Sequence, residues 1–334
     1  ENTETRDNEI LTGRDFAAMS DSELLTLLKN YTIKIIARAK PDDKARLVKL
    51  LQRNHEIVAV TGDGTNDAPA LSKAHVGLSM GDGTARAKEA SDITIIDNSF
   101  ASINKAILWG RSIYKNIRRF IVFQTIVNVS ACLIVLFGAF VGLDSPLNVM
   151  QMLWVNLIMD TFAALALSTI APDPNVMTEK PRSWRAHIIT RPTAIYIFSY
   201  GIAFFAFLAC LWMKLLYNNE GMPHLDKHEL GMFFSIFVFL QLWNLPNTRY
   251  FDTRRSFIGD IVNWAKGKIT HSDIFSMSFG MIMLVILLGQ MLIVELFGEA
   301  FGVDSLTIKN WTIAFAATSP VFIVPEIIRW FRNK

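Results

Sequence analysis

The sequence predicts an α/β domain of the Rossmann type, followed by an all-α bundle of six transmembrane helices. Short β-branched runs alternate with amphipathic segments up to about residue 100, as in parallel βαβ units. Beyond that point the chain holds six apolar stretches, each close to the length that crosses a bilayer. The hydrophobic fraction of 51% and the mean hydropathy of +0.30 are also high for a soluble protein.

The first hundred residues supply the elements of the α/β domain. Strands are predicted over 32–37, 57–60, 76–80 and 93–96. Helices are predicted between them, over 42–52, 68–74 and 85–90. Before these, we expect a flexible lead-in and a helix that Ser20 caps, with Glu23 completing a capping box. The predicted domains are therefore 1–100 and 101–334.

The membrane domain is predicted to have six spans. They cover about 117–142, 149–170, 193–217, 230–249, 274–297 and 310–330. The helix of the first span is expected to begin near Ile103, which would make it a rigid link to the soluble domain. Seventeen Lys and Arg residues flank one side of the spans and three flank the other. The positive-inside rule therefore predicts that the soluble part and the C-terminus are cytosolic.

Composition also excludes some classes of partner. The net charge of +3 is small, and no basic stripe with interleaved aromatic residues indicates nucleic-acid binding. The two cysteines, Cys132 and Cys210, lie inside apolar runs. We interpret them as small buried hydrophobic residues without a disulfide partner.

The stretch from Thr61 to Leu71 carries the most specific chemistry of the soluble part. It follows a predicted strand, and Asp63 and Asp67 bracket the amide of Asn66. In open α/β sheets, ligands bind at the carboxyl ends of the strands. Mg²⁺ prefers a few carboxylate oxygens together with water and phosphate. We predict that Asp63 binds Mg²⁺ and that Asn66 and Asp67 hold its water and phosphate. The alternative is an acidic turn that caps the next helix.

A second group of polar residues lies inside the predicted spans. Asn156 and Asp160 are four residues apart, so an α-helix would place both side chains on one face. Asn128 in the first span adds another amide oxygen. One carboxylate and two amide oxygens are hard ligands that suit Ca²⁺. Hydrogen bonding between helices would explain Asn128, but it explains poorly an ionisable group such as Asp160.

The motif TGDGTNDAPAL at 61–71 resembles the hinge motif of P-type ATPases, the cation pumps that form an aspartyl-phosphate. The resemblance implies a haloacid-dehalogenase-like phosphorylation domain, with Mg²⁺ as cofactor and ATP as substrate. It places Thr61, Gly62 and Asp63 beside the cofactor and makes Lys44 the lysine that faces the phosphate. Gly81–Thr84 is either an ordinary turn or a further part of the site.

The nucleophile of these pumps is an aspartate in the sequence Asp-Lys-Thr-Gly-Thr, which this chain does not contain. The resemblance therefore implies the C-terminal part of a pump, whose partner is the missing N-terminal part that binds most of the ATP. On its own the chain is expected to be inactive.

The membrane region sharpens the resemblance. Leu153–Asp160 resembles the sixth span of calcium pumps, most closely the plasma-membrane type, and Asn128 matches a ligand position in the fifth span. Ala131 and Met159 stand where two-site pumps carry oxygen ligands, which implies one Ca²⁺ per cycle. Gln241 matches a polar position of the eighth span and is ranked low as a ligand.

The leading hypothesis is an ATP-driven Ca²⁺ exporter of the cell membrane. One alternative is a secretory-pathway pump that carries Mn²⁺ as well as Ca²⁺. Another is a non-catalytic membrane fragment that regulates a full-length partner.

Overall fold

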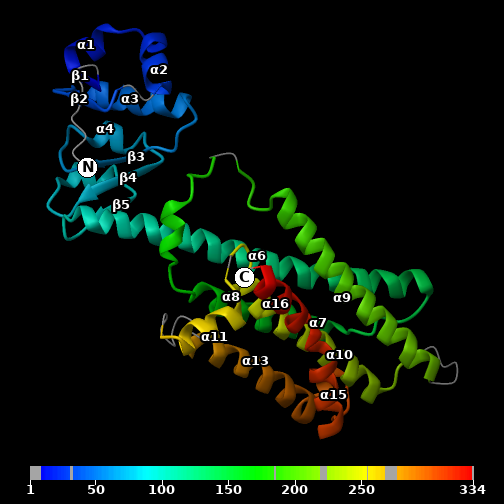
Figure 1. Ribbon diagram of the computed structural model, residues 1–334. Coiled ribbons are helices and arrows are strands. Elements are labelled where there is room, and N and C mark those ends of the chain that lie inside the picture. Colours follow the sequence, from blue (N-terminus) through cyan, green and yellow to red (C-terminus); the bar gives the residue numbers. More distant parts are fainter. Residues whose placement is uncertain are drawn as a thin grey trace. The chain divides into compact units, whose positions relative to one another are not determined.

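The structure, a computed structural model, describes residues 9–30, 33–183, 186–218, 224–253, 255–267 and 277–332. The chain divides into two compact units. The soluble unit comprises residues up to Gly110 together with Pro174–His187, and the helical unit comprises Arg111–Asp173 and Ile188 onward. Helix α6, Phe100–Val141, runs without a break from one unit into the other (Figure 1).

The strands of the soluble unit form two small parallel sheets. One sheet pairs β1 (Ile10–Thr12) with β2 (Ile35–Ala37), and the other has the order β3 (Ala59–Gly62), β4 (Val76–Met80) and β5 (Ile93–Ile95). This confirms the predicted α/β class, although β1 was not predicted. Residues 1–8 and Thr32, the start of the first predicted strand, lie outside the described residues. Ile10–Ala18, which precede the Ser20-capped helix and were expected to be a flexible lead-in, instead form β1 and a short helix.

Helices lie between the successive strands of this unit. They are α1 (Gly13–Ala18), α2 (Asp21–Lys29), α3 (Pro41–Arg53), α4 (Ala68–Leu71) and α5 (Ala85–Glu89). The capping box at the start of α2 is confirmed: Glu23 N–H donates to Ser20 Oγ, and Ser20 N–H donates to Glu23 Oε2 at 2.8 Å. Helix α3 follows β2 closely and has proline at its first position. Lys44 therefore lies in the first turn of α3.

The helical unit confirms the prediction of six membrane-competent helices. Those that are long and apolar enough to cross a membrane span Phe100–Val141, Val149–Ser168, Arg191–Tyr217, Lys227–Arg249, Ser278–Leu296 and Ile308–Arg332. Residues 274–276 of the predicted fifth span lie outside the described residues.

Two of the six helices are interrupted. The last consists of α15 (Ile308–Thr318) and α16 (Pro320–Arg332), because proline cannot donate the hydrogen bond that would continue α15. The second consists of α7 (Val149–Leu153), a π-helix (Trp154–Met159) and α8 (Asp160–Ser168).

Helix α10 (Lys227–Arg249) is the central helix of this unit. In its most apolar 18-residue stretch 78% of the residues are buried, against 22–39% in the corresponding stretches of the other five membrane-competent helices. It contacts α9 (Arg191–Asn218), α13 (Met277–Leu296), α15 and α16. Among the described residues, the remaining short elements are a 3₁₀ turn (Pro174–Thr178), α11 (Phe257–Ala265) and α14 (Gly298–Phe301).

One prediction about the cysteines was wrong. Cys132 and Cys210 are free thiols, but both are exposed on the helical unit rather than buried in it. An apolar setting does not imply burial here, because the outer surface of a membrane bundle is itself apolar. Leu136 and Phe140, on the same helix as Cys132, are exposed in the same way.

Candidate functional site

The soluble site is built on the loop that leaves β3. Gly62 ends that strand, and a Cβ atom there would lie 2.4 Å from the Cβ atom of Asp67. A residue with a side chain at this position would therefore displace Asp67, and glycine allows the loop to fold back on itself. Asp67 N–H also donates to Gly64 O at 3.1 Å, which closes the turn.

Lys44 and Asp67 form the ion pair of this loop. Lys44 Nζ lies 2.7 Å from Asp67 Oδ1, and Gly64 N–H donates to Asp67 Oδ2 at 3.3 Å. Partial burial opposes ionisation of Asp67. The hydrogen bond and charge of Lys44, with the backbone N–H groups of the loop, outweigh it and lower the Asp67 pKa from its usual value. Asp67 is therefore a fixed anion, held by a cation from α3.

The turn at 81–84 lies against the same loop. Thr84 N–H donates to Asp63 O at 2.8 Å, and a Cβ atom on Gly83 would lie 3.2 Å from the Asp63 Cα atom. The side chains of Asp63 and Asn66 are exposed. Carboxylate and amide oxygens of this kind fit Mg²⁺. The structure thus gathers Lys44, Asp63 and Asp67 in one region, with Gly83 and Thr84 beside them.

The membrane site centres on Asp160, the first residue of α8. Asp160 is only 5% exposed, and neither of its carboxylate oxygens has a hydrogen-bond partner that meets ordinary distance and angle criteria among the described residues. Gln124 of α6 is the side chain that lies close to it. A buried carboxylate without a hydrogen-bond donor is costly, so it indicates a bound cation or proton.

The helix around Asp160 differs from the prediction. We expected an α-helix through Asn156 and Asp160, but Trp154–Met159 is a π-helix, in which Asp160 N–H donates to Val155 O. π-Helical turns are rare and occur frequently at functional sites. Asn128 and Asn156 are exposed while Asp160 is buried, so the described residues do not close a shell around the three predicted ligands.

Comparisons with known proteins decide the family. The model of the cation transporting ATPase C-terminus matches residues 144–331, and that of haloacid dehalogenase-like hydrolases matches residues 30–107. The chain belongs to the cation-transporting ATPases. This agrees with the P-type resemblance of the hinge motif and of the second span.

Relatives narrow the comparison within the cation-transporting ATPases. The chain is 39% identical over 312 residues to the plasma membrane-type calcium-transporting ATPase 5 of Oryza sativa subsp. japonica. The matched region covers 91% of this chain and 27% of that protein. The chain is 43% identical over 263 residues to calcium-transporting ATPase 9, plasma membrane-type, of Arabidopsis thaliana (77% and 24%). It is 35% identical over 326 residues to plasma membrane calcium-transporting ATPase 4 of Bos taurus (90% and 26%). The chain therefore spans about a quarter of the length of these relatives.

Other polar groups of this ATPase chain are also buried in the helical unit. Gln241 and Asn244 of α10 are fully buried, and no amide atom of either side chain has a hydrogen-bond partner among the described residues. Gln241 was predicted to be only a weak ligand candidate, and Asn244 was not predicted as a ligand. The signal was available, because residues three apart share one face of a helix. Glu295 is instead paired, as Trp311 Nε1–H donates to it at 2.8 Å.

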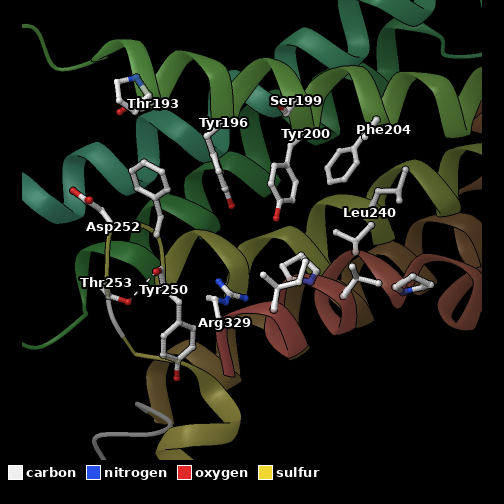
Figure 2. Close-up of a pocket in the computed structure, with 18 of the residues that line it drawn as sticks. Thr193, Tyr196, Ser199, Tyr200, Phe204, Leu240, Tyr250, Asp252, Thr253 and Arg329 are labelled. Carbon is white, nitrogen blue, oxygen red and sulfur yellow. Dashed lines mark hydrogen bonds between the residues drawn. The ribbon is translucent and has the colours of Figure 1, made fainter. Parts of the chain in front are cut away.

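A large pocket of the helical unit is a poor candidate for the cation site. About 1060 Å³ in volume, it is lined by α9, α10, α16 and the segment after α10, and Figure 2 shows Tyr196, Tyr200 and Phe204 facing Leu240 across it. Its lining contains three arginines, Arg118, Arg329 and Arg332, against one carboxylate, that of Asp252. Arg118 Nη1 lies 2.5 Å from Asp252 Oδ2, and Arg329 Nη2 donates to Asn247 Oδ1 at 2.7 Å. Positive charge at its wall disfavours a cation, whereas Asp160 attracts one.

Proposed function

We propose that the chain forms part of an ATP-driven pump that moves Ca²⁺ across the cell membrane. The observation that carries the proposal is Asp160, a carboxylate that is 5% exposed within a membrane-competent helix and lacks a hydrogen-bond partner among the described residues. The names of the relatives, all calcium-transporting ATPases, support Ca²⁺ as the substrate. Asn128 and Asn156 would add amide oxygens, which Ca²⁺ accepts readily.

The soluble unit would carry out phosphoryl transfer. Asp63 would bind Mg²⁺, which neutralises charge on the phosphoryl oxygens, and Asn66 and Asp67 would hold its water and phosphate. Lys44 contributes a fixed positive charge to the same region. The 334 residues contain no Asp-Lys-Thr-Gly-Thr sequence, so the phosphoryl-accepting aspartate and most of the ATP site would come from polypeptide outside them. The chain alone would then be inactive.

Helix α6 is the proposed link between the two reactions. It runs unbroken from Phe100 to Val141 and carries Gln124 and Asn128. Phosphorylation would bias a two-state equilibrium of the soluble unit, and a stiff helix would carry that bias to the ion site. In this scheme the soluble unit and the C-terminus are cytosolic, as the positive-inside rule predicts.

The site would hold one Ca²⁺ per cycle. Ala131 and Met159, which stand where two-site pumps carry oxygen ligands, are both 1% exposed. Their apolar side chains offer no oxygen to a second ion. A buried position filled by a methyl or thioether group therefore favours a single site.

The test is ⁴⁵Ca²⁺ uptake into inside-out vesicles that contain the complete pump, compared with its Asp160→Asn variant. We expect ATP-dependent uptake, and loss of uptake in the variant at Ca²⁺ concentrations that saturate the parent. Parallel uptake of ⁵⁴Mn²⁺ would indicate the secretory-pathway type instead. Absence of any ATP-dependent uptake would favour a regulatory fragment.

A further inference from the structure

The indole of Trp154 fills a notch on α13. A Cβ atom built on Gly289 would lie 2.9 Å from Trp154 Cη2 and 3.3 Å from Trp154 Cζ2. The ring therefore occupies the space that any other residue at position 289 would claim. Trp154 is 8% exposed, and its Nε1 atom has no hydrogen-bond partner among the described residues. Packing rather than hydrogen bonding holds the ring in place.

Helix α13 is itself fixed at this level. Gln290, the neighbour of Gly289, is fully buried, and its Nε2 atom donates to Ser235 Oγ of the central helix α10 at 3.4 Å. Helix α13 also packs along α8. A larger residue at position 289 would therefore push the indole away rather than move α13, because close-packed interiors have little spare volume.

Trp154 is also the first residue of the π-helix that leads to Asp160. In a π-helix the N–H group bonds five residues back instead of four, and Asp160 N–H bonds to Val155 O in this way. Return to α-helical geometry would remove one residue from the turn. Successive residues of an α-helix are rotated about the helix axis by about 100°. Loss of one residue from the turn would therefore change the direction in which the Asp160 side chain points relative to α7.

We propose that Gly289 is a positioning residue for the ion site. By admitting the Trp154 indole, it sustains the π-helical turn that directs Asp160 into the bundle. The inference rests on the proposed function, because it assumes that Asp160 binds the transported Ca²⁺. Gly289 touches neither Ca²⁺ nor nucleotide, and its effect passes through Trp154.

The experiment measures Ca²⁺-dependent ATP hydrolysis by the complete pump in Gly289→Ala, Trp154→Phe and the double variant. Leu288→Ala is the matched control, since Leu288 directly precedes Gly289 on α13 and is 54% exposed. We expect Gly289→Ala to raise the Ca²⁺ concentration for half-maximal activity about tenfold, with little change in kcat. The shorter ring of Trp154→Phe does not reach the new methyl group, so the double variant should match Trp154→Phe alone. Leu288→Ala should behave as the parent.

Each outcome decides the proposal. A Gly289→Ala variant with the parent's Ca²⁺ dependence overturns it, as does a double variant that needs more Ca²⁺ than Trp154→Phe alone. If Gly289→Ala does not accumulate in membranes, Trp154→Phe decides: a raised Ca²⁺ requirement supports the proposal and an unchanged one overturns it. Asp160→Asn distinguishes failure of this proposal from failure of the proposed function. Parental Ca²⁺ dependence in that variant would contradict the proposed function itself.

Discussion

Lys44 Nζ lies 2.7 Å from Asp67 Oδ1, although the two residues are 23 positions apart in the chain. The pair joins the first turn of α3 to the loop that leaves β3. Both residues were predicted to belong to the soluble site. Their contact joins the helix that follows the two-stranded sheet to the loop that leaves the first strand of the three-stranded sheet, so charges that are distant in sequence lie together.

Replacing Lys44 by alanine should impair catalysis much more than folding. The ammonium group forms an ion pair with Asp67, and loss of such a group typically slows a reaction by about 10²- to 10³-fold. The Lys44 side chain is 45% exposed, so the free energy of unfolding should change by no more than about 1 kcal/mol. Phosphoenzyme formation from ATP by the complete pump measures the first effect, and thermal unfolding measures the second. A fall in phosphoenzyme formation that is fully explained by a loss of folded protein would contradict this role.

The Asp67 carboxylate should make the soluble unit sensitive to acid. Its pKa is lowered in the folded chain, so its contribution to stability is complete above the unfolded-state pKa and is lost as the pH falls through the folded-state value. Asp67→Asn lacks this titration. The difference in thermal unfolding temperature between parent and variant should therefore shrink from neutral pH to about pH 3. A difference that grows on acidification would show that the sign is wrong.

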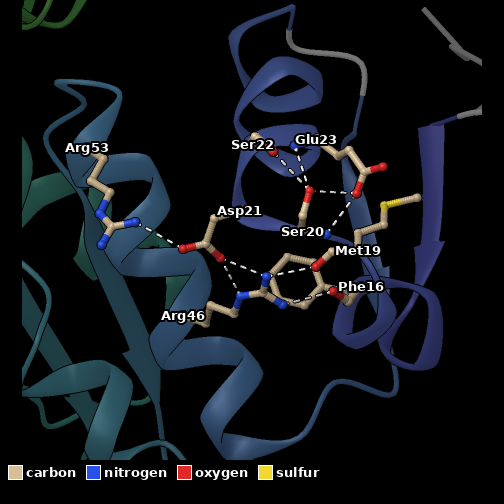
Figure 3. Close-up of polar contacts among 8 residues, drawn as sticks. All are labelled: Phe16, Met19, Ser20, Asp21, Ser22, Glu23, Arg46 and Arg53. Carbon is tan, nitrogen blue, oxygen red and sulfur yellow. Dashed lines mark hydrogen bonds and ion pairs between the residues drawn. The ribbon is translucent and has the colours of Figure 1, made fainter.

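Arg46 should stabilise the start of the soluble unit, whereas Arg53 should not. Figure 3 shows both arginines on Asp21, but Arg46 also donates to Phe16 O at 3.1 Å and to Met19 O at 2.8 Å. Its guanidinium lies 5.4 Å from the centre of the Phe16 ring. Arg46→Ala should cost about 2 kcal/mol through two lost hydrogen bonds and the ring contact. Arg53→Ala removes only an exposed pair and should cost less than about 1 kcal/mol.

Hydrogen exchange of the α1 and α2 amides, followed by mass spectrometry on the whole chain, checks this prediction. Faster exchange in Arg46→Ala than in Arg53→Ala is expected. The same exchange rates in both variants would mean that the backbone contacts of Arg46 add nothing.

The single ion predicted from Ala131 and Met159 can be counted. Equilibrium ⁴⁵Ca²⁺ binding to the purified complete pump, divided by the amount of phosphoenzyme it forms, should approach one. A ratio near two would require oxygen ligands other than those at the two apolar positions, and the fully buried amides of Gln241 and Asn244 would be the first candidates.

Much of the architecture could be predicted because it follows from local patterns. Strands β2 to β5, the capping box at Ser20 and the six apolar helices all have direct signals in composition and spacing. Strand β1 was missed because Ile10 and Leu11 are the only apolar residues of a polar stretch, and Ile10–Thr12 gain their order by pairing with β2. Short strands are set by tertiary contacts more than by their own sequence.

The two sites were less predictable for the same reason. The residue types at Asp63, Asp67 and Asp160 could be singled out, but the hydrogen bonds of Asp67 and the burial of Asp160 depend on residues far along the chain. The π-helix at Trp154–Met159 has no periodic signal of its own. Its contact with Gly289 joins residues on different helices, and only the folded bundle brings them together.

The most direct test of the central claim is equilibrium Ca²⁺ binding to the purified complete pump and to its Asp160→Asn variant, without ATP. Asp304→Asn serves as the control, since Asp304 is an exposed aspartate in the segment after α14. We predict saturable binding in the parent and in Asp304→Asn, and at least about a hundredfold weaker binding in Asp160→Asn, because the only carboxylate of the predicted ligand set is lost. Parental affinity in Asp160→Asn would contradict it.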